Sequence, residues 1–263
     1  MTYHNDYQYL SKSFLAKFEL SPLHAYHYMT SEVKKDTPAM QFGRVYHSVI
    51  AGEKYAIIDE AQRPEPDKTF ASKLNKEWKE SIIQTAKNQK LDIVSAEDHI
   101  EIMGMIDILR ANEIVQKINA FELRQEETFK AEVNGRKLKC KPDGLQIGRG
   151  ENKANLIIDW KTCQTIAPRS IMYDFPKYGY DVQAAVYCDV ISKLHGGESN
   201  MLFIFQEKDA PYDVLPVLVN ADSETMQYGR EKYQRYYDKA MECFDSGVWP
   251  GVASHYHEKI LVL

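Results

Sequence analysis

Two aspartates and a lysine in the middle of the chain have the residue types and spacing of a divalent-metal site. Asp143 follows one strand-like run, and Asp159 and Lys161 end another. Side chains alternate between the two faces of a strand, so Asp159 and Lys161 project together. Ile158 and Trp160 project to the opposite side. One face of this strand therefore suits a hydrophobic core and the other suits chemistry.

Carboxylate oxygens are the ligands that Mg²⁺ prefers, and Mn²⁺ accepts them as well. A bound metal can generate hydroxide and hold a phosphate, while a nearby ammonium can position water or offset negative charge. The pattern therefore predicts a divalent-metal site that could hold a phosphate. So short a pattern also leaves a second interpretation open, a solvated pair of strands with incidental charges.

A tight hairpin is predicted to bring a third carboxylate to this site. Asn134-Gly135 between two alternating runs is typical of a two-residue type I′ turn. Pairing Val133 with Arg136 across it places Glu126 opposite Asp143, unless Pro142 introduces a bulge. The expected apolar face consists of Phe129, Ala131, Val133, Leu138 and Cys140. The opposite face carries Glu126, Lys130, Lys137, Lys139, Lys141 and Asp143.

Three lysines of the second hairpin strand, Lys137, Lys139 and Lys141, are predicted to form a cationic stripe that contacts phosphates. A solvated sheet face explains them equally well. The net charge of −5 and the pI of about 5.9 do not by themselves indicate a nucleic-acid-binding protein. A local stripe can nevertheless bind phosphates while metal ions screen the acidic site.

Capping residues mark the helices that must position this sheet. Ser11 or Ser13 can cap a first helix, and Ser21-Pro22 opens a second. Thr37-Pro38 opens another that Gly52 ends. Within it His47 lies one turn after Gly43, and on sequence alone it is an ordinary core histidine.

The remaining elements complete an alternating helix and strand pattern. A one-sided apolar stripe from Asp67 to Lys90 predicts a helix that packs on the sheet, and Ser95 caps the next one. A helix from Tyr180 onward places Gln183 and Tyr187 on one face, which without other evidence is an ordinary surface pair. Later elements are strands at 201–206 and 214–219 and a helix at 223–245. The expected fold is a three-layer α/β domain.

Length and composition limit the class of protein. The 263 residues are 44% hydrophobic and 27% charged, which fits one large domain. No apolar run reaches 18 residues, and the start of the chain does not resemble a signal peptide, so we expect a cytoplasmic location and no membrane partner. The four cysteines are far apart, which argues against a zinc ribbon and suits reduced thiols.

Longer segments of the chain resemble a known family. PDG at 142–144 and LIIDWKT at 156–162 resemble the core of PD-(D/E)xK nucleases. Further segments resemble the RecE-type exonucleases: SP at 21–22, PAMQFGRVYHSVI at 38–50, EETF at 126–129, YGYDVQAAVY at 178–187 and GVWPG at 247–251. The resemblance implies a single restriction-endonuclease-like domain over residues 1–263, with a mixed central sheet flanked by helices and additional N-terminal helices.

The resemblance also implies roles for individual residues. Metal ligands would be His47, Asp143, Asp159 and the carbonyl of Trp160. The implied metal is Mg²⁺, although histidine is a more usual ligand for Mn²⁺. Lys161 would hold water or stabilise the phosphate. The remaining residues expected at the site are Glu126, Tyr180, Gln183 and Tyr187.

The implied activity is metal-dependent digestion of linear double-stranded DNA from its ends, 5′ to 3′, beside a single-strand annealing protein. The family also implies a ring-shaped trimer or tetramer, for which the tyrosine-rich helix with Tyr228, Tyr233, Tyr236 and Tyr237 is a candidate interface. The alternative is a catalytically idle DNA-binding module. A zinc hydrolase built on His24, His27, His255 and His257 is a third possibility that lacks the H-E-x-x-H spacing.

Overall fold

The central sheet carries the two aspartates of the predicted site. The computed structural model describes residues 6–31, 36–148 and 154–255. The four strands lie in the order β6 (Gly144–Gln146), β7 (Asn155–Cys163), β8 (Ser199–Glu207) and β9 (Val214–Val219). The pair β7 and β8 is parallel, while β6 and β9 run antiparallel to their neighbours. The sheet is therefore mixed, as expected.

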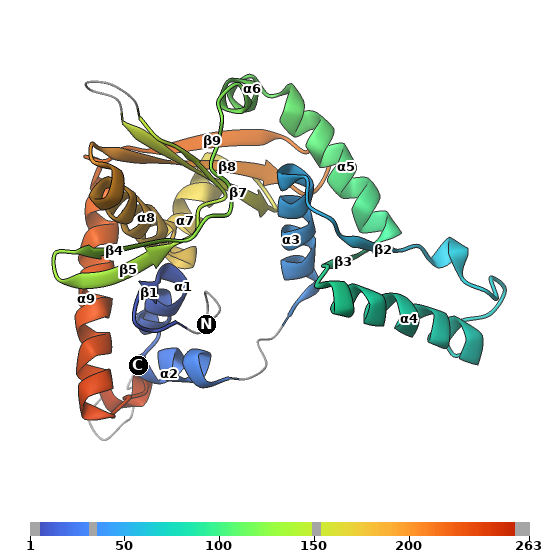
Figure 1. Cartoon of the computed structure of the whole chain (residues 1–263), viewed down its shortest axis with the longest axis horizontal. Helices are drawn as coiled ribbons and strands as arrows, with labels where there is room; N and C mark the ends of the chain where they lie inside the picture. Colours follow the sequence, from blue (N-terminus) through green and yellow to red (C-terminus); the bar gives the residue numbers. More distant parts are fainter. Residues whose placement is uncertain (1–5, 32–35, 149–153, 256–263) are drawn as a thin grey trace.

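Helices cover both faces of this sheet (Figure 1). On one side lie α7 (Pro168–Tyr178), α8 (Tyr180–His195) and α9 (Glu224–Ser246). On the other lie α3 (Pro38–Ala51), α5 (Ala96–Ala111) and α6 (Glu113–Asn119). Ile157 of β7 belongs to the hydrophobic core below α8, whereas Ile158 and Trp160 belong to the core below α3 and α5. The three-layer α/β prediction is confirmed.

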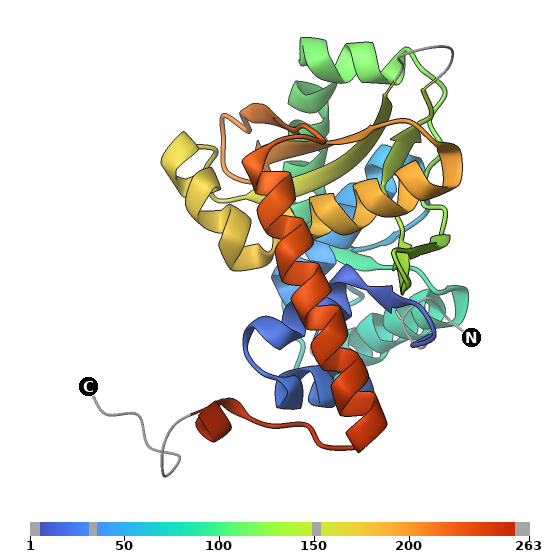
Figure 2. The ribbon, with the colours of Figure 1, turned by 90° about the vertical axis from the view of Figure 1, so that its left-hand side faces the viewer.

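The two long helices of the first side cross at close range (Figure 2). Gly229 of α9 lies against the backbone of Asp181 at the start of α8. A Cβ atom at position 229 would stand 2.1 Å from the Asp181 carbonyl oxygen, which no side chain tolerates. This contact places α8 firmly between α9 and the central sheet, so its inward-facing side chains have defined positions.

A second, three-stranded sheet is built on the predicted hairpin. Its order is β1 (Leu10–Ser11), β5 (Arg136–Cys140) and β4 (Phe129–Val133). Asn134 and Gly135 both have positive φ, as a type I′ turn requires, and Val133 pairs with Arg136. The ladder ends at Phe129 and Cys140. The predicted pairing of Glu126 with Asp143 is wrong, because the Glu126 N–H donates to the Pro142 carbonyl, 3.2 Å away.

Short helical segments precede and follow these layers: α1 (Lys12–Leu15), η2 (Ala16–Glu19), α2 (Pro22–Thr30) and η4 (Val252–His255). The predicted caps are present. Ser11, Ser21 and Thr37 each accept a hydrogen bond from a backbone N–H three residues ahead, and Gly52 ends α3 in a left-handed conformation.

One region extends away from the central sheet (Figure 1). It consists of β2 (Ala56–Ile58), η3 (Glu60–Gln62), α4 (Lys73–Gln89) and β3 (Ile93–Ser95). The strands β2 and β3 form a separate parallel pair, and α4 lies beside it. The prediction that this helix packs on the central sheet is wrong. It also begins later than expected, because Asn75 holds the preceding loop through hydrogen bonds to Glu65, Lys68 and Thr69.

All four cysteines lie in the described part of the chain and are free thiols. None of the helices among the described residues combines the length and apolar character needed to cross a bilayer.

Candidate metal centre

Neighbouring positions on β6 and β7 bring the two aspartates together. Gly144 pairs with Ile158, so Asp143 and Asp159 flank the same pair of residues across the two strands. The Trp160 N–H donates to Asp143 Oδ2 over 2.8 Å. The backbone of β7 therefore holds the Asp143 carboxylate, while the Trp160 ring is buried on the opposite face, as the alternation predicts.

Asp159, Lys161 and Gln183 form one side of the centre, which we call the sealed wall. The Lys161 ammonium forms an ion pair with Asp159 Oδ2. From α8, Gln183 donates through Nε2 to Asp159 Oδ1 over 2.5 Å. Asp159 is only 3% exposed, and despite the ion pair its Oδ2 accepts no hydrogen bond of good geometry from the described residues. A buried carboxylate oxygen is thus left with capacity for another partner.

His47, Glu126 and Asp143 form the other side, which we call the open wall. His47 projects from α3, and its Nδ1 atom lies 3.3 Å from Asp143 Oδ2. Glu126 comes from the segment before β4, has a φ of 54°, and forms an ion pair with Lys141. The possible ligand atoms of the three residues all lie within 4.8 Å of one another. All three side chains are partly exposed to solvent, so a metal ion could reach them.

The pKa values of the two aspartates shift in opposite directions. Burial raises the pKa of Asp159, and the negative charge of Asp143 adds to this rise. Burial would also raise the pKa of Asp143, but the hydrogen bond and charge of His47, with the Lys161 charge, lower it overall. The charge of Asp143 thus disfavours ionisation of its neighbour Asp159, and a divalent cation between them would offset that repulsion.

The same two aspartates raise the pKa values of the basic residues His47 and Lys161. Burial by itself lowers the pKa of His47, but the hydrogen bond to Asp143 outweighs burial and raises it. Burial likewise lowers the pKa of Lys161, and the charges of Asp159 and Asp143 outweigh it, so that the pKa is raised. Lys161 is therefore a cation at neutral pH.

The donor set fits a hard divalent ion. Carboxylate oxygens with one imidazole suit Mn²⁺ and are compatible with Mg²⁺. Asp159, which lies across the strand pair from Asp143, offers a further carboxylate oxygen, Oδ2, whose partner among the described residues is the Lys161 ammonium. Glu126 was predicted as a catalytic residue rather than a ligand, and its convergence with His47 could not be read from the sequence.

Other predicted residues are placed around this centre. The ring centroid of Tyr180 lies 5.6 Å from Lys161 Nζ. The Tyr187 hydroxyl donates to the Lys141 carbonyl over 3.4 Å. Lys137 is exposed. The prediction that Lys139 is an exposed phosphate contact is wrong. Lys139 pairs with Ser11 of β1, is 2% exposed, and donates through its ammonium to the Asp6 carbonyl.

One basic residue at the site was missed from sequence. Lys12 follows β1 directly, and the pairing of β1 with β5 carries it to the junction of α7 and α8. Its ammonium donates to the Tyr178 carbonyl over 2.9 Å and lies 5.8 Å from the Tyr180 ring centroid. No local pattern around Lys12 predicts this position, since it depends on pairing between distant segments.

The histidines proposed for a zinc hydrolase do not support that alternative. His24 contacts the Ser21 hydroxyl through Nδ1 over 2.7 Å, and His27 contacts the Ser31 hydroxyl. Within the ranges that the structure describes, neither belongs to a group of three possible ligands. His257 and the side chain of His255 lie outside the described residues.

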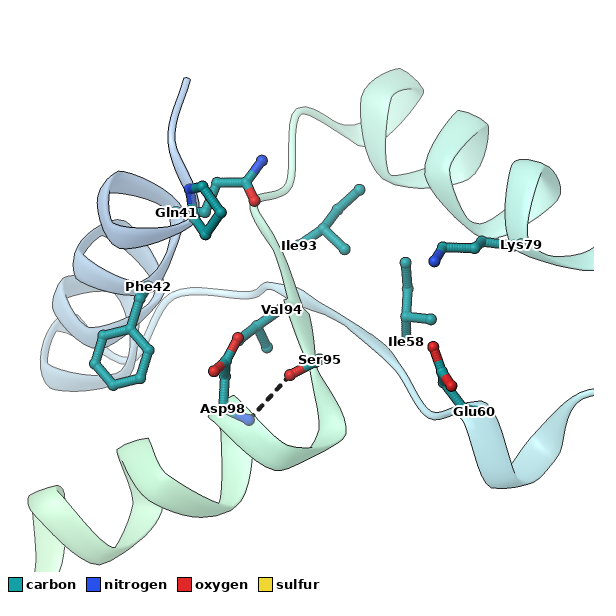
Figure 3. A pocket seen from close by; sticks show the side chains of 10 residues that line it. Gln41, Phe42, Ile58, Glu60, Lys79, Ile93, Val94, Ser95 and Asp98 are labelled. Carbon is teal, nitrogen blue, oxygen red and sulfur yellow. Dashed lines mark hydrogen bonds between the residues drawn. The ribbon is translucent and has the colours of Figure 1, made fainter. Parts of the chain in front are cut away.

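A cavity of about 220 Å³ lies elsewhere, between α3, α4 and the β2–β3 pair (Figure 3). Phe42, Ile58, Val94 and Lys79 are among its lining residues, and the bond from the Asp98 N–H to the Ser95 hydroxyl borders it. None of the predicted site residues lines it. The candidate metal centre therefore lies outside this cavity.

Asp143 lies across a mixed sheet from Asp159, which begins the Asp-x-Lys motif that ends at Lys161. This arrangement defines a protein of the PD-(D/E)xK class. The chain belongs to the family described as "PDDEXK-like domain of unknown function (DUF3799)", whose model matches residues 11–257. The superfamily expected from the sequence motifs is thereby confirmed. Among curated proteins, none matches the chain.

One solved structure shares the fold of this chain. A protein from Eubacterium rectale, described as a candidate exonuclease, superposes with a TM-score of 0.68 at 15% identity, over 100% of this chain and 95% of that one. A phage-related exonuclease from Haemophilus somnus 129PT matches 89% of this chain and 95% of its own length, with 13% identity and a TM-score of 0.32. At such identities, the first match shows the fold alone.

Proposed function

We propose that this protein is a metal-dependent deoxyribonuclease that shortens linear double-stranded DNA from its ends and leaves single strands. The observation that carries the proposal is the convergence of the sealed wall and the open wall on one centre, with three carboxylates, an imidazole and a lysine. A catalytically idle DNA-binding module would have no need to hold a charged, half-buried Lys161 beside Asp159.

The proposed metal ligands are His47, Asp143 and Asp159, with the Trp160 carbonyl and Glu126 as further candidates. When bound, Mg²⁺ or Mn²⁺ would polarise the phosphate and lower the pKa of a water molecule. Lys161 would hold that water or stabilise the charge that develops on the phosphate oxygens. Its ion pair with Asp159 keeps the ammonium oriented before substrate binds.

Gln183 and Tyr187 project from one face of α8 toward this centre. The hydrogen bond from Gln183 fixes the orientation of Asp159, and the amide can also donate to a phosphate oxygen. Tyr180 supplies a ring beside Lys161. Lys137 and Lys141 remain candidate phosphate contacts, although Lys141 is already paired with Glu126.

The finer features are proposed from the family resemblance. They are 5′ to 3′ polarity, cooperation with a single-strand annealing protein, cytoplasmic location, and assembly of this single nuclease domain into a ring. The tyrosine-rich helix is a poor candidate for the ring interface, because Tyr233, Tyr236 and Tyr237 are buried within the protein and only Tyr228 is well exposed. A ring would therefore use another surface.

The test uses the pure protein with end-labelled linear DNA and with covalently closed DNA. We expect Mg²⁺ or Mn²⁺ to permit shortening of the linear substrate alone, and chelator to stop it. Labelling each end in turn reports the polarity. Cleavage of closed DNA would contradict the exonuclease assignment, and binding without any cleavage in either metal would favour the idle module.

A further inference from the structure

Aromatic rings and lysines alternate in a continuous series from the exposed face of α7 to Lys161. Lys177 Nζ lies 5.4 Å from the Tyr173 ring centroid and 4.9 Å from that of Tyr178. The rings of Tyr178 and Tyr180 are 5.8 Å apart, and Tyr180 borders Lys161 at 5.6 Å. We call Tyr173, Lys177, Tyr178, Tyr180 and Lys12 the α7 track.

The outer end of the α7 track is open to solvent. Tyr173 is 67% exposed and Tyr178 is 50% exposed. A different face of α7 packs against the hydrophobic core, through the buried Ile171 and through Phe175, which contacts Phe203. The two tyrosines therefore form a second aromatic face of α7 that is at least half exposed to solvent, a feature typical of a binding surface.

Lys12 adds positive charge to the inner end. Its ammonium is held by the Tyr178 carbonyl and by the Tyr180 ring, and among the described residues it has no carboxylate within ion-pair distance. Burial lowers the pKa of Lys12 to about 8, and the charge of Lys161 contributes in the same direction. Two cations beside one ring would be stabilised by an anion between them. Farther out, Lys177 has only a loose ion pair with Asp174, 3.9 Å away.

Tyrosine faces interleaved with lysines have the chemistry of single-stranded nucleic-acid binding. Each base has a face that can stack on a ring, and each linking phosphate can pair with an ammonium. In a duplex the base faces are occupied by neighbouring bases, so exposed rings gain little from it. The favoured occupant is therefore an unpaired strand.

We propose that the α7 track binds an unpaired DNA strand that runs to the bond cleaved at Lys161. Bases would stack on Tyr173 and Tyr178, while Lys12 and Lys177 would contact phosphates. The inference rests on the proposed nuclease function, because it assigns the surface that guides one strand of the substrate to the metal centre.

The test measures binding without cleavage. Full-length protein in chelator is titrated against three labelled probes: a short single strand, the same strand with abasic sites, and a covalently closed duplex. Tyr173→Ala and Tyr178→Ala should each weaken binding of the intact single strand by roughly tenfold, the usual size of one lost base–aromatic stack. Binding of the abasic strand and the closed duplex should not change.

Two further variants sharpen the result. Tyr228→Ala removes a tyrosine of α9 that is 62% exposed and lies outside the α7 track, so it should leave all three affinities unchanged. Lys12→Gln keeps most of the side-chain stem and should lower the slope of log affinity against log salt by roughly 0.7, which corresponds to one phosphate contact on a single strand. Unchanged circular dichroism confirms that each variant folds.

Two outcomes would overturn the inference. One is single-strand affinity in the Tyr173→Ala/Tyr178→Ala double variant equal to that of the wild type. The other is an equal loss for the closed duplex. Either result, beside metal-dependent shortening of linear DNA by the wild type, would leave the nuclease proposal intact. A selective loss of single-strand affinity in a protein that never cleaves DNA would support the α7 track and reject the nuclease.

Discussion

The two walls of the metal centre contribute carboxylates to the same space but are built differently. In the sealed wall, Asp159 forms an ion pair with Lys161 and accepts a hydrogen bond from Gln183, and its side chain is 5% exposed. In the open wall, the side chains of His47 and Glu126 are 30% and 32% exposed. One wall binds its carboxylate through neighbouring side chains, whereas the other gathers possible ligand atoms at the solvent boundary.

This difference follows from where the residues lie in the fold. Asp159 and Lys161 belong to β7, an interior strand with β6 and β8 on its two sides and α8 across its face. Asp143 and Glu126 instead lie outside the strands, shortly before β6 and β4 begin, and His47 reaches the site from α3. Under the proposed function, the sealed wall would supply the fixed electrostatics of catalysis, while the open wall would control how readily metal binds.

We expect the largest effect on cleavage from substitution of Asp159, the carboxylate of the sealed wall. Asp159→Ala should reduce cleavage of linear DNA to background, because it removes a proposed metal ligand and the partner of Lys161. Asp159→Asn is the matched control for size, since it keeps the shape but not the charge, and it should also be inactive. Binding of closed duplex DNA in chelator should persist in both variants. Full activity in either variant would show that Asp159 is not a ligand.

Removal of the lysine should produce a smaller loss. Lys161→Met keeps the apolar stem and should lower turnover by roughly a hundredfold, the scale seen when one electrostatic stabiliser is removed. Metal affinity, measured by calorimetry with Mn²⁺, should be retained or increased, because a neighbouring positive charge is gone. If metal affinity collapsed while turnover per bound metal stayed constant, the assignment of Lys161 to the chemical step would be wrong.

A still smaller effect is expected from Gln183. Gln183→Ala should lower turnover by roughly tenfold, because Asp159 loses one hydrogen bond to a charged group but keeps Lys161. The affinity for Mn²⁺ should stay near that of the wild type, since the amide is not a ligand. Tyr187→Phe is a useful comparison on the same face of α8, because it removes a hydroxyl whose hydrogen bond to the Lys141 carbonyl is long, at 3.4 Å. Unchanged cleavage in Gln183→Ala would make the residue an ordinary part of the helix.

The role of the open wall can be tested through the pH dependence of metal affinity. The raised pKa of His47 means that the imidazole keeps its proton to a higher pH than usual, and a protonated imidazole cannot bind metal. Mn²⁺ affinity should therefore increase as pH rises through this pKa and level off above it, by a factor of roughly three to ten between pH 6 and pH 8. In His47→Gln the dependence should become shallower. An identical pH dependence in the variant would exclude His47 from the ligands.

The sequence by itself determined the local elements and the faces of the key strand. Caps at Ser11, Ser21 and Thr37, the Asn134-Gly135 turn, and the opposite faces of Asp159 and Trp160 could all be predicted. Each depends on residues close in the chain, because capping, turn geometry and side-chain alternation are set by near neighbours. The motifs around Asp143 and Asp159 indicated the superfamily for a related reason, since they lie in two short, contiguous segments.

Only the tertiary structure decided how distant segments meet. The parallel pairing of β1 with β5 buries Lys139 and carries Lys12 to the α7–α8 junction. The end of the hairpin ladder shifts Glu126 by one position and turns it toward His47. No periodicity encodes these contacts, because they join residues far apart in sequence and depend on the packing of whole elements against one another.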